Sequence, residues 1–423
     1  MQAKAAVLYG KNKIKVSAIN LPEIGEEELL VKVISNSLCF STYKAATLGE
    51  DHKRVPNDIK ENPIITGHEF AGIIAKVGSK LTDKFIVGDK FVLQPAMGLD
   101  SGYSAGYSYA EFGGNATYCI IPKVAIDLGC VLPYEGEYFA NASLAEPMCC
   151  IIGAFEAAYH TIEYDYNHYM GIKKDGRLAL LGATGPMGIG AIDYAINGKV
   201  KPKQIVVTDI NQERINRAKT LISEEYAKER GVDLIYMNVS SNNATQKLLD
   251  ITNGKGYDDV FVLIANSQIM IQADNILGRD GCLNIFAGPT DKNFQVPFNF
   301  YNVHYNQAHV VGTSGGSTGD MLTSLTLSAE GKINPSYMIS HIGGLNSAPE
   351  SILNLEKLQA GKRLIYPHID LDLTAINDFE ELGKNNDLFR NLAVICKKYN
   401  NIWSEEAEKY LFKYFSFDPY KLD

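Results

Sequence analysis

The sequence predicts an α/β protein with two domains, a doubly wound parallel sheet and a separate β-rich domain. Three observations support this fold class. Between about residues 174 and 315, apolar segments typical of buried strands alternate with helical segments. Before residue 126, the chain consists instead of short strand-like segments separated by glycine and proline. Its 423 residues are enough for two or three domains, at roughly 150 residues each.

The first part of the chain predicts the β-rich domain. Runs of β-branched and aromatic residues bounded by turn-forming residues are typical of strands. Such runs occur at residues 4–9, 29–33, 67–77 and 89–93. We expect the first part of this domain to span residues 1–165.

The middle of the chain predicts the parallel sheet, in a domain spanning residues 166–315. Repeated strand–helix units place strands side by side in parallel and cover both faces of the sheet with helices. A helical segment at residues 211–222 is one example of the connections between strands. The expected strands lie at residues 177–181, 204–209, 234–238, 259–264, 282–286 and 309–312.

Beyond residue 316 the pattern is mostly helical, with one more strand expected at residues 363–369. Apolar residues at helical spacing near the C-terminus predict a helix that packs on the body of the protein. The apolar stripe consists of Trp403, Ala407, Tyr410, Leu411, Tyr414 and Phe415.

Composition excludes several classes of protein. With 40 basic and 49 acidic side chains, the net charge of −9 provides no electrostatic footprint for nucleic acid. We find no run of eighteen apolar residues that would indicate a membrane helix. The seven cysteines are an odd, scattered set, which favours reduced thiols and a cytoplasmic location.

A glycine-rich turn follows the expected strand at residues 177–181 and predicts a Rossmann cofactor site. Gly185 and Gly188 match the last two positions of the dinucleotide-binding pattern, while its first position falls on Ala183. Asp209, at the end of the next strand, lies where an acid can bind ribose hydroxyls. It favours NAD over NADP by repelling a 2′-phosphate, although the choice stays open. The turn's candidate binding residues are Gly182, Ala183, Gly185, Pro186, Met187 and Gly188.

A candidate metal site is divided among three segments of the first half. Thiolate, imidazole and carboxylate are the ligands that zinc prefers, and a catalytic zinc keeps one position open. Cys39, His68 and Glu146 can supply three ligands, with Glu69 as a supporting or exchanging ligand. Ser41 is two residues from Cys39 and is a candidate to pass the alcohol proton. From spacing alone, a buried core cysteine and a hydrogen-bonded histidine are the more common explanation of such residues.

These motifs resemble the medium-chain dehydrogenase/reductase superfamily, in its zinc-containing polyol dehydrogenase branch. The matching residues are Gly67-His68-Glu69, Gly88-Asp89, Glu146-Pro147 and the turn at residues 185–188. The resemblance implies a GroES-like catalytic domain with zinc at Cys39, His68 and Glu146. It also implies that residues 316–423 return to that domain and add C-terminal helices, and that the protein is a homodimer or homotetramer.

Further segments resemble the L-sorbose 1-phosphate reductases within that branch. The implied activity is hydride transfer between NAD(H) or NADP(H) and a ketose phosphate, with L-sorbose 1-phosphate reduced to D-glucitol 6-phosphate. The alternative is a dehydrogenase of an unphosphorylated polyol or secondary alcohol, as in sorbitol or threonine dehydrogenases. A binding protein on the same fold is disfavoured because the ligand residues are present. The segments lie at residues 52–56, 113–118, 278–282, 298–305, 312–316 and 341–345.

Two departures from the family pattern refine these expectations. The segment 94–115 has no cysteine, so we expect one catalytic zinc and no structural zinc. Thr42 stands where many members carry an acid.

A substrate phosphate needs cationic groups, and Lys44, Lys53 and Arg54 are the candidates, with His52 beside them. A solvated basic turn is the alternative interpretation of this cluster.

Overall fold

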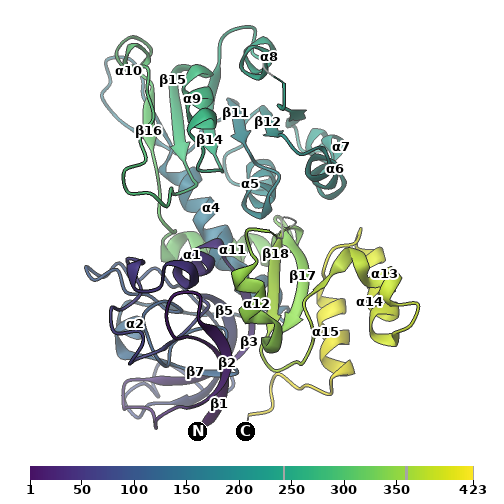
Figure 1. The fold of residues 1–423 in the computed structure, drawn as a ribbon. Helices are drawn as coiled ribbons and strands as arrows, with labels where there is room; N and C mark the ends of the chain where they lie inside the picture. Colours follow the sequence, from purple (N-terminus) through teal and green to yellow (C-terminus); the bar gives the residue numbers. More distant parts are fainter. Residues whose placement is uncertain (242, 358–360, 423) are drawn as a thin grey trace. The chain divides into compact units, whose positions relative to one another are not determined.

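The computed structural model describes residues 1–241, 243–357 and 361–422, and the chain divides into two compact units (Figure 1). Unit 1 consists of Met1–Glu146 and Ile339–Asp423, and unit 2 of Pro147–Met338. The chain thus enters unit 2 before the boundary expected at residue 165, and leaves it after the one expected at residue 315.

An eight-stranded sheet organises unit 1, in the order β19-β17-β18-β3-β5-β6-β8, with β7 also paired to β3. A smaller sheet has the order β2-β1-β4. Three strands of the large sheet come from the returning C-terminal part: β17 (Ile339–Gly344), β18 (Lys362–Tyr366) and β19 (Thr374–Ala375). The other strands of the large sheet are β3 (Leu29–Leu38), β5 (Glu69–Val77), β6 (Lys90–Leu93), β7 (Tyr118–Ile121) and β8 (Val131–Pro133). The smaller sheet consists of β1 (Gln2–Leu8), β2 (Ile14–Asn20) and β4 (Ile64–Ile65).

Strand register in this sheet brings distant parts of the chain together. Ser37 near the end of β3 is opposite Glu69 at the start of β5. On the other side of β3, Leu38 is opposite Arg363 in β18. The end of β3, the start of β5 and the start of β18 therefore lie side by side.

Helices complete unit 1. The expected C-terminal helix forms as α15 (Glu405–Tyr414), and its Ala407 and Leu411 are buried. Glu408 of α15 accepts hydrogen bonds from the backbone N–H groups of Phe139 and Ala140. The helix therefore packs on the body as expected, although Tyr414 of the predicted stripe is exposed. The other helices are α1 (Phe40–Leu48), α2 (Lys123–Asp127), α3 (Phe139–Ser143), α12 (Ala348–Leu353), α13 (Phe379–Leu382) and α14 (Asp387–Lys398).

Unit 2 contains a six-stranded, fully parallel sheet in the order β13-β12-β11-β14-β15-β16. This order is that of a doubly wound dinucleotide-binding fold, and all six strands expected from the sequence are present. The strands are β11 (Arg177–Leu181), β12 (Gln204–Asp209), β13 (Asp233–Asn238), β14 (Tyr257–Val262), β15 (Leu277–Ile285) and β16 (His309–Val311).

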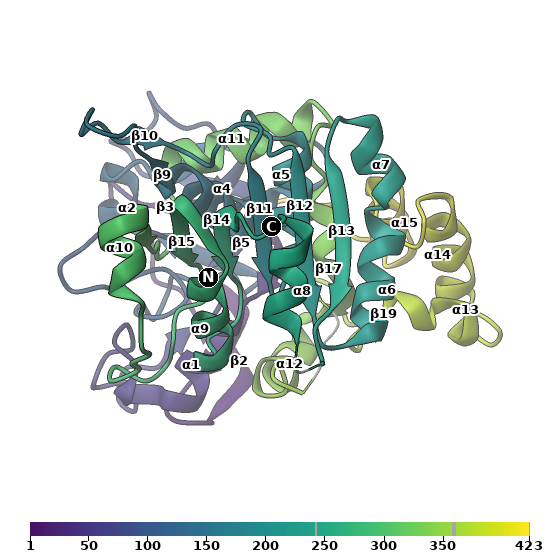
Figure 2. The same cartoon turned by 90° about the horizontal axis from the view of Figure 1, so that it is seen from above.

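Helices cover both faces of this sheet. Figure 2 shows α5 (Pro186–Asn197) on one side and α8 (Ala244–Ile251) with α9 (Ser267–Asn275) on the other. The remaining elements are α4 (Ala145–Ala157), the hairpin of β9 (Tyr159–His160) and β10 (Tyr169–Met170), α6 (Gln212–Leu221), α7 (Glu224–Glu229), α10 (Phe300–Asn306) and α11 (Thr318–Ala329).

Contacts of α4 and α11 explain why unit 2 is larger than expected. Phe155 of α4 packs against Phe261 of β14, with ring centroids 4.7 Å apart. Cys149 of α4 contacts the backbone oxygen of Ser317 just before α11. Both helices therefore pack within unit 2. Neither was expected in this domain from the sequence, because both lie outside the alternating strands and helices of residues 166–315.

A buried acid in α5 makes the stability of unit 2 depend on pH. Burial raises the pKa of Asp193 from 3.8 to about 7, although it accepts hydrogen bonds from Asn334 and Asn197. The folded state therefore binds this proton more tightly than the unfolded state. Its stabilising contribution is present below about pH 4 and is lost as the pH rises to about 7.

We expect the free energy of unfolding of the wild type to fall over this range, by at most about 4 kcal/mol. Denaturant unfolding at pH 5 and pH 8 measures the change. Asp193→Asn removes the titration, and Asn197 can rotate its amide to match the new side chain. An unchanged pH dependence in this variant would show that another group is responsible.

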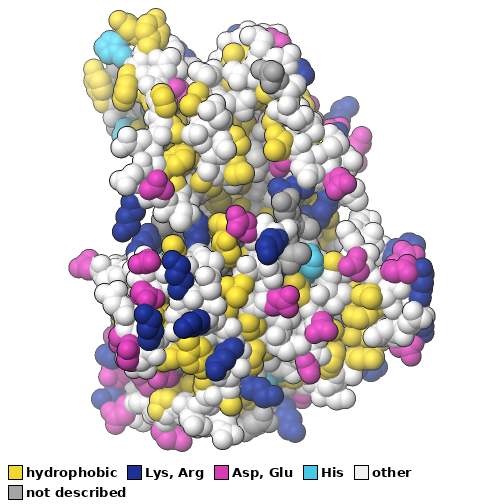
Figure 3. Space-filling view, viewed as in Figure 1, with side chains coloured by type: hydrophobic (Ala, Val, Ile, Leu, Met, Phe, Trp, Pro, Cys, Tyr) yellow, Lys and Arg dark blue, Asp and Glu magenta, His cyan; other side chains and the backbone are white. Residues whose placement is uncertain are grey.

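Two further features of the structure are the length of its helices and the distribution of charge on its surface. Among the described residues, no helix is long and apolar enough to cross a membrane. Figure 3 shows basic and acidic side chains interspersed over one face of the molecule.

Candidate active site

The metal-ligand candidates of the sequence converge in unit 1. Cys39 follows β3 and caps α1, while His68 directly precedes β5 and Glu69 begins it. Ligand atoms of these three residues lie within 4.8 Å of one another. Glu146, in the first turn of α4, interacts electrostatically with His68 and Glu69. We call these four residues the metal-ligand group.

A glycine turn places His68 in this group. Gly67 has a φ of +99°, and a Cβ there would lie 2.7 Å from the backbone nitrogen of Asn115. A Cβ on Gly106 would approach the backbone oxygen of Gly67 to 2.1 Å. Only glycine fits at both positions, because each combines positive φ with close backbone contact.

Hydroxyl groups surround the imidazole of His68. Its Nδ1 lies 3.3 Å from Oγ1 of Thr42, and its Nε2 lies 3.4 Å from Oγ of Ser41. Thr42, for which the resemblance noted above implies an acid, therefore contacts the histidine through its hydroxyl. Burial lowers the pKa of His68 despite the nearby carboxylates, so the ring is neutral, as a metal ligand must be.

Glu69 forms a buried ion pair with Lys362, the first residue of β18. The ammonium of Lys362 contacts both carboxylate oxygens, with 2.6 Å to Oε2, and Ser37 donates a hydrogen bond to the same carboxylate. Only 4% of the Lys362 side chain and 1% of the Glu69 side chain is exposed. Although burial opposes its charge, the Glu69 carboxylate raises the pKa of Lys362. These contacts direct Glu69 toward Lys362.

The electrostatics of the group favour a bound cation. Burial and the neighbouring Glu69 raise the pKa of Glu146 to about 7 and also raise the pKa of the Cys39 thiol. A divalent cation would compensate these acids and release their protons. Sulfur, imidazole nitrogen and carboxylate oxygen together are a donor set that suits zinc, so the residues present fit this metal.

Tyr107 and Lys362 belong to this site although the sequence did not point to either. Tyr107 is buried, donates a hydrogen bond to Ser41 at 2.6 Å, and lies 3.2 Å from Nε2 of His68. Ser41 donates in turn to the sulfur of Cys39 at 2.9 Å. In the sequence, the segment that carries Tyr107 is notable only because it lacks the cysteines of a structural zinc site.

The basic residues Lys44, His52, Lys53 and Arg54, here called the basic cluster, are adjacent to this site. Burial, followed by the charges of Arg54, Lys53 and Lys44, lowers the pKa of His52 to about 4. Burial also lowers the pKa of Lys44, which interacts electrostatically with both Cys39 and Lys53. Lys44, Lys53 and Arg54, the three cations predicted to bind phosphate, therefore lie close to one another. A concentration of positive charge at a partly buried location attracts an anion.

The glycine turn of unit 2 has the form of a phosphate-binding turn. Gly182 has a φ of +66°, and Gly185 caps α5. A Cβ on Gly188 would lie 2.0 Å from the backbone oxygen of Ala183, so helix and strand pack closely there. A Cβ on Gly185 would meet nothing within 4 Å, which leaves its side of the turn open. Backbone N–H groups at a helix start bind phosphate, so the turn fits a dinucleotide.

The other predicted cofactor residues lie around this turn. Pro186 and Met187 begin α5. Thr184 donates to the carboxylate of Asp209 at the end of β12, and that carboxylate also accepts from the backbone of Asn211 at 2.9 Å. The sequence-predicted cofactor residues are therefore together at the carboxyl ends of β11 and β12.

A second group of titratable residues in unit 2 is saturated with hydrogen bonds. His160, Asp280 and His309 place their side-chain atoms within 4.8 Å of one another. The Asp280 carboxylate already accepts from Thr161 and contacts both histidines. His160 also contacts Asp259, at 3.2 Å. The carboxylates of Asp280 and Asp259 thus engage all three facing nitrogens of the two histidines, and we interpret this network as structural.

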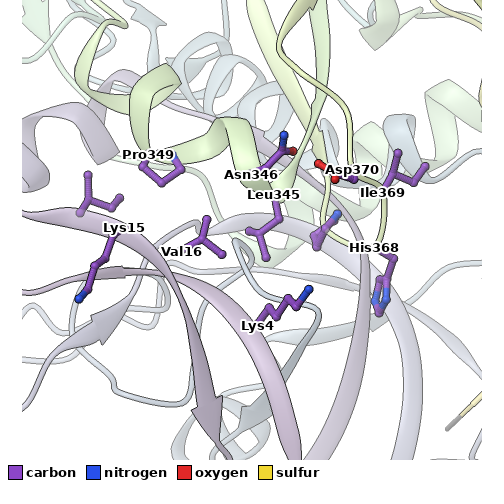
Figure 4. Close-up of a pocket in the computed structure, with 11 residues that line it drawn as sticks. Lys4, Lys15, Val16, Leu345, Asn346, Pro349, His368, Ile369 and Asp370 are labelled. Atoms are coloured by element: carbon purple, nitrogen blue, oxygen red, sulfur yellow. The ribbon is translucent and has the colours of Figure 1, made fainter.

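Unit 1 has a cavity of about 470 Å³, whose lining is shown in Figure 4 and includes no residue of the metal-ligand group. Its lining includes Lys4, Lys15, Asn346, His368 and Asp370. None of the predicted site residues lines it, so we do not assign it to the chemistry.

Comparison with known proteins matches both units. Residues 25–131 match the model of the alcohol dehydrogenase GroES-like domain, and residues 186–330 match that of the zinc-binding dehydrogenase. The chain is 60% identical over 415 residues to a mannitol-1-phosphate 5-dehydrogenase of Aliivibrio fischeri, covering 98% of each chain. It is 41% identical over 413 residues to the L-sorbose 1-phosphate reductase of Klebsiella pneumoniae, covering 97% of this chain and 98% of the relative.

Solved structures agree on the fold. A 2R,3R-butanediol dehydrogenase from Bacillus subtilis matches with a TM-score of 0.70 at 20% identity, covering 86% of this chain and all of its own. A zinc-binding dehydrogenase from Sinorhizobium meliloti, bound to NADP, matches with the same TM-score at 19% identity, covering 87% of this chain and all of its own.

Proposed function

The chain belongs to the zinc-dependent medium-chain dehydrogenase/reductase superfamily, and we propose that it interconverts a hexitol phosphate and the corresponding ketose phosphate. Membership makes it an oxidoreductase that acts on CH–OH groups with zinc and a nicotinamide cofactor. The proposal concerns the substrate, the residues that act on it and the number of zinc ions.

The observation that carries the proposal is the position of the basic cluster beside the metal-ligand group. Arg54 lies over the ring of Tyr107, whose hydroxyl is close to His68. An enzyme for a neutral polyol has no need of such charge next to its reacting centre. A phosphate ester does need it, since guanidinium and ammonium groups neutralise phosphate. The relatives named for phosphorylated substrates favour the same class.

We propose that Cys39, His68 and Glu146 hold one zinc ion. Glu69 lies near His68, with its Oε1 3.9 Å from Nε2 of His68, but Lys362 and Ser37 already bind its carboxylate. This engagement supports Glu146 as the carboxylate ligand and Glu69 as a supporting or exchanging residue. Bound there, zinc supplies Lewis-acid polarisation of the substrate oxygen, while the nicotinamide supplies hydride chemistry. The segment 94–115 contains no cysteine, so a four-cysteine structural zinc is not part of the proposal.

The residues of this chain then orient the substrate and handle its proton. Ser41 is positioned to exchange the proton of the substrate hydroxyl, because its own hydroxyl lies between Cys39, His68 and Tyr107. Lys44, Lys53 and Arg54 hold the phosphate. The glycine turn at residues 182–188 binds the pyrophosphate of the cofactor. Asp209 favours NAD over NADP because its carboxylate would repel a 2′-phosphate.

A substrate panel tests the proposal. NADH and NADPH oxidation is followed with L-sorbose 1-phosphate and free L-sorbose, and NAD⁺ reduction with D-mannitol 1-phosphate and free D-mannitol. We expect the phosphate esters to be preferred by at least about 100-fold in kcat/KM, as expected for two or more charged hydrogen bonds. Equal turnover of the free sugars would favour the alternative, an unphosphorylated polyol dehydrogenase.

Replacing Arg54 by alanine tests the phosphate role directly. We expect KM for the preferred sugar phosphate to rise about tenfold or more, because a charged hydrogen bond contributes roughly 1.5–3 kcal/mol. Lys60→Ala is the matched control. Lys60 is an exposed basic residue of the same segment, and it pairs with Glu50 at 2.8 Å. An unchanged KM in the Arg54 variant would exclude this residue from phosphate binding.

A further inference from the structure

One buried side chain, Tyr107, joins the metal-ligand group to the basic cluster. Its hydroxyl donates to Ser41 and lies 3.2 Å from Nε2 of His68. The face of its ring has the guanidinium carbon of Arg54 at 5.2 Å from the centroid. The ring of His52 stacks on it at 5.8 Å, with 10° between the planes.

The backbone around Tyr107 is fixed to the same two places. Gly106 presses against Gly67, in the turn that positions His68. On the other side, Ser108 donates a hydrogen bond to the backbone oxygen of Arg54 at 2.7 Å. The loop at residues 106–108 is thus attached to the turn of His68 by a backbone contact and to Arg54 by the Ser108 side chain, as well as by the tyrosine.

We infer that Tyr107 is a positioning residue that sets the basic cluster against the metal-ligand group, and so confers preference for a phosphorylated substrate. The inference rests on the proposed function and deepens it. A cation–π contact with the ring holds the Arg54 guanidinium in place without using its N–H groups as donors, so these can bind a phosphate. The ring therefore acts on substrate binding through Arg54.

The hydroxyl of Tyr107 has a separate role. Its hydrogen bond to Ser41 leaves the proton of Ser41 directed at Cys39. Loss of the hydroxyl would let Ser41 rotate, which affects turnover and leaves phosphate binding intact. Ring and hydroxyl can therefore be separated by two substitutions at one position.

Tyr107→Phe and Tyr107→Leu are compared with the wild type, using L-sorbose 1-phosphate, D-mannitol 1-phosphate and the free sugars. For Tyr107→Leu we expect KM for the preferred phosphate ester to rise roughly 5- to 30-fold, the range of a cation–π contact. KM for the free sugar should stay within about twofold, while kcat should fall about as far as in Tyr107→Phe, because leucine also lacks the hydroxyl. For Tyr107→Phe we expect KM to stay within about twofold while kcat falls about tenfold, as for one lost hydrogen bond.

Tyr109→Leu is the matched control, because Tyr109 contacts Tyr103 and Phe112 and lies outside the site. Zinc content and inhibition by inorganic phosphate are measured for every variant. We expect full zinc in all of them, and weaker phosphate inhibition in Tyr107→Leu alone.

The outcomes separate the inference from the function on which it rests. A wild type without preference for phosphate esters overturns the proposed function. A wild type with that preference, unchanged in Tyr107→Leu, overturns the inference alone. If Tyr107→Leu loses zinc or fails to fold, Tyr107→Met is tested. Loss of zinc from that variant as well would show that Tyr107 supports the metal-ligand group rather than specificity.

Discussion

Replacing Cys39 by alanine is expected to remove bound zinc and activity together. The thiol is one of the donors that lie within 4.8 Å of one another, and a site with only imidazole and carboxylate ligands left binds zinc much more weakly. We expect less than about 0.1 zinc per chain after dialysis, and a fall in kcat/KM of at least about 10⁴-fold, since Lewis-acid stabilisation contributes several kcal/mol. Metal analysis and steady-state kinetics on the same preparation measure both quantities.

Cys119→Ala is the control for this substitution. Cys119 lies in β7 within the core of unit 1, where burial raises the pKa of its thiol to about 12. Its loss removes a sulfur from the same unit without touching the metal-ligand group, so zinc and activity should be retained. A Cys39 variant with full zinc content and full activity would contradict the assignment of this residue as a ligand.

The sequence predicted unit 2 more completely than unit 1. Strands β11 and β12 have the residues expected, because buried parallel strands are short apolar runs with turn signals at both ends. Strand β17 was missed. It contains His341, Gly343 and Gly344, and its place in the sheet depends on pairing with β18 and β19 rather than on local pattern.

The candidate site shows the same division between local and distant information. Cys39, His68 and the glycine turn stand in recognisable motifs, and the structure brings Cys39, His68 and Glu69 together. Lys362 contacts Glu69 across 293 positions of the chain, and Tyr107 lies 66 positions from Ser41. No spacing rule reveals such pairs. They depend on the register of β3, β5 and β18 and on the packing of a loop that has no regular secondary structure.

The buried pair of Lys362 and Glu69 leads to the largest stability change that we expect. Lys362→Met would leave the Glu69 carboxylate buried, with Ser37 as a neutral hydrogen-bond donor in place of the ammonium. Removing one partner of a buried ion pair costs about 3–5 kcal/mol, because the remaining charge is uncompensated. We expect this loss in the free energy of unfolding, measured in denaturant with zinc removed.

Two comparisons establish the cause of that loss. In the double variant Lys362→Met, Glu69→Gln no charge is stranded, so most of the stability should return. Added zinc should also reduce the loss in Lys362→Met, since a cation beside Glu69 replaces the missing ammonium. Lys76→Met, which breaks the exposed pair with Glu23, should change stability little, because solvent already screens exposed pairs. A double variant as unstable as Lys362→Met would show that packing of the lysine chain, rather than its charge, stabilises this part of the sheet.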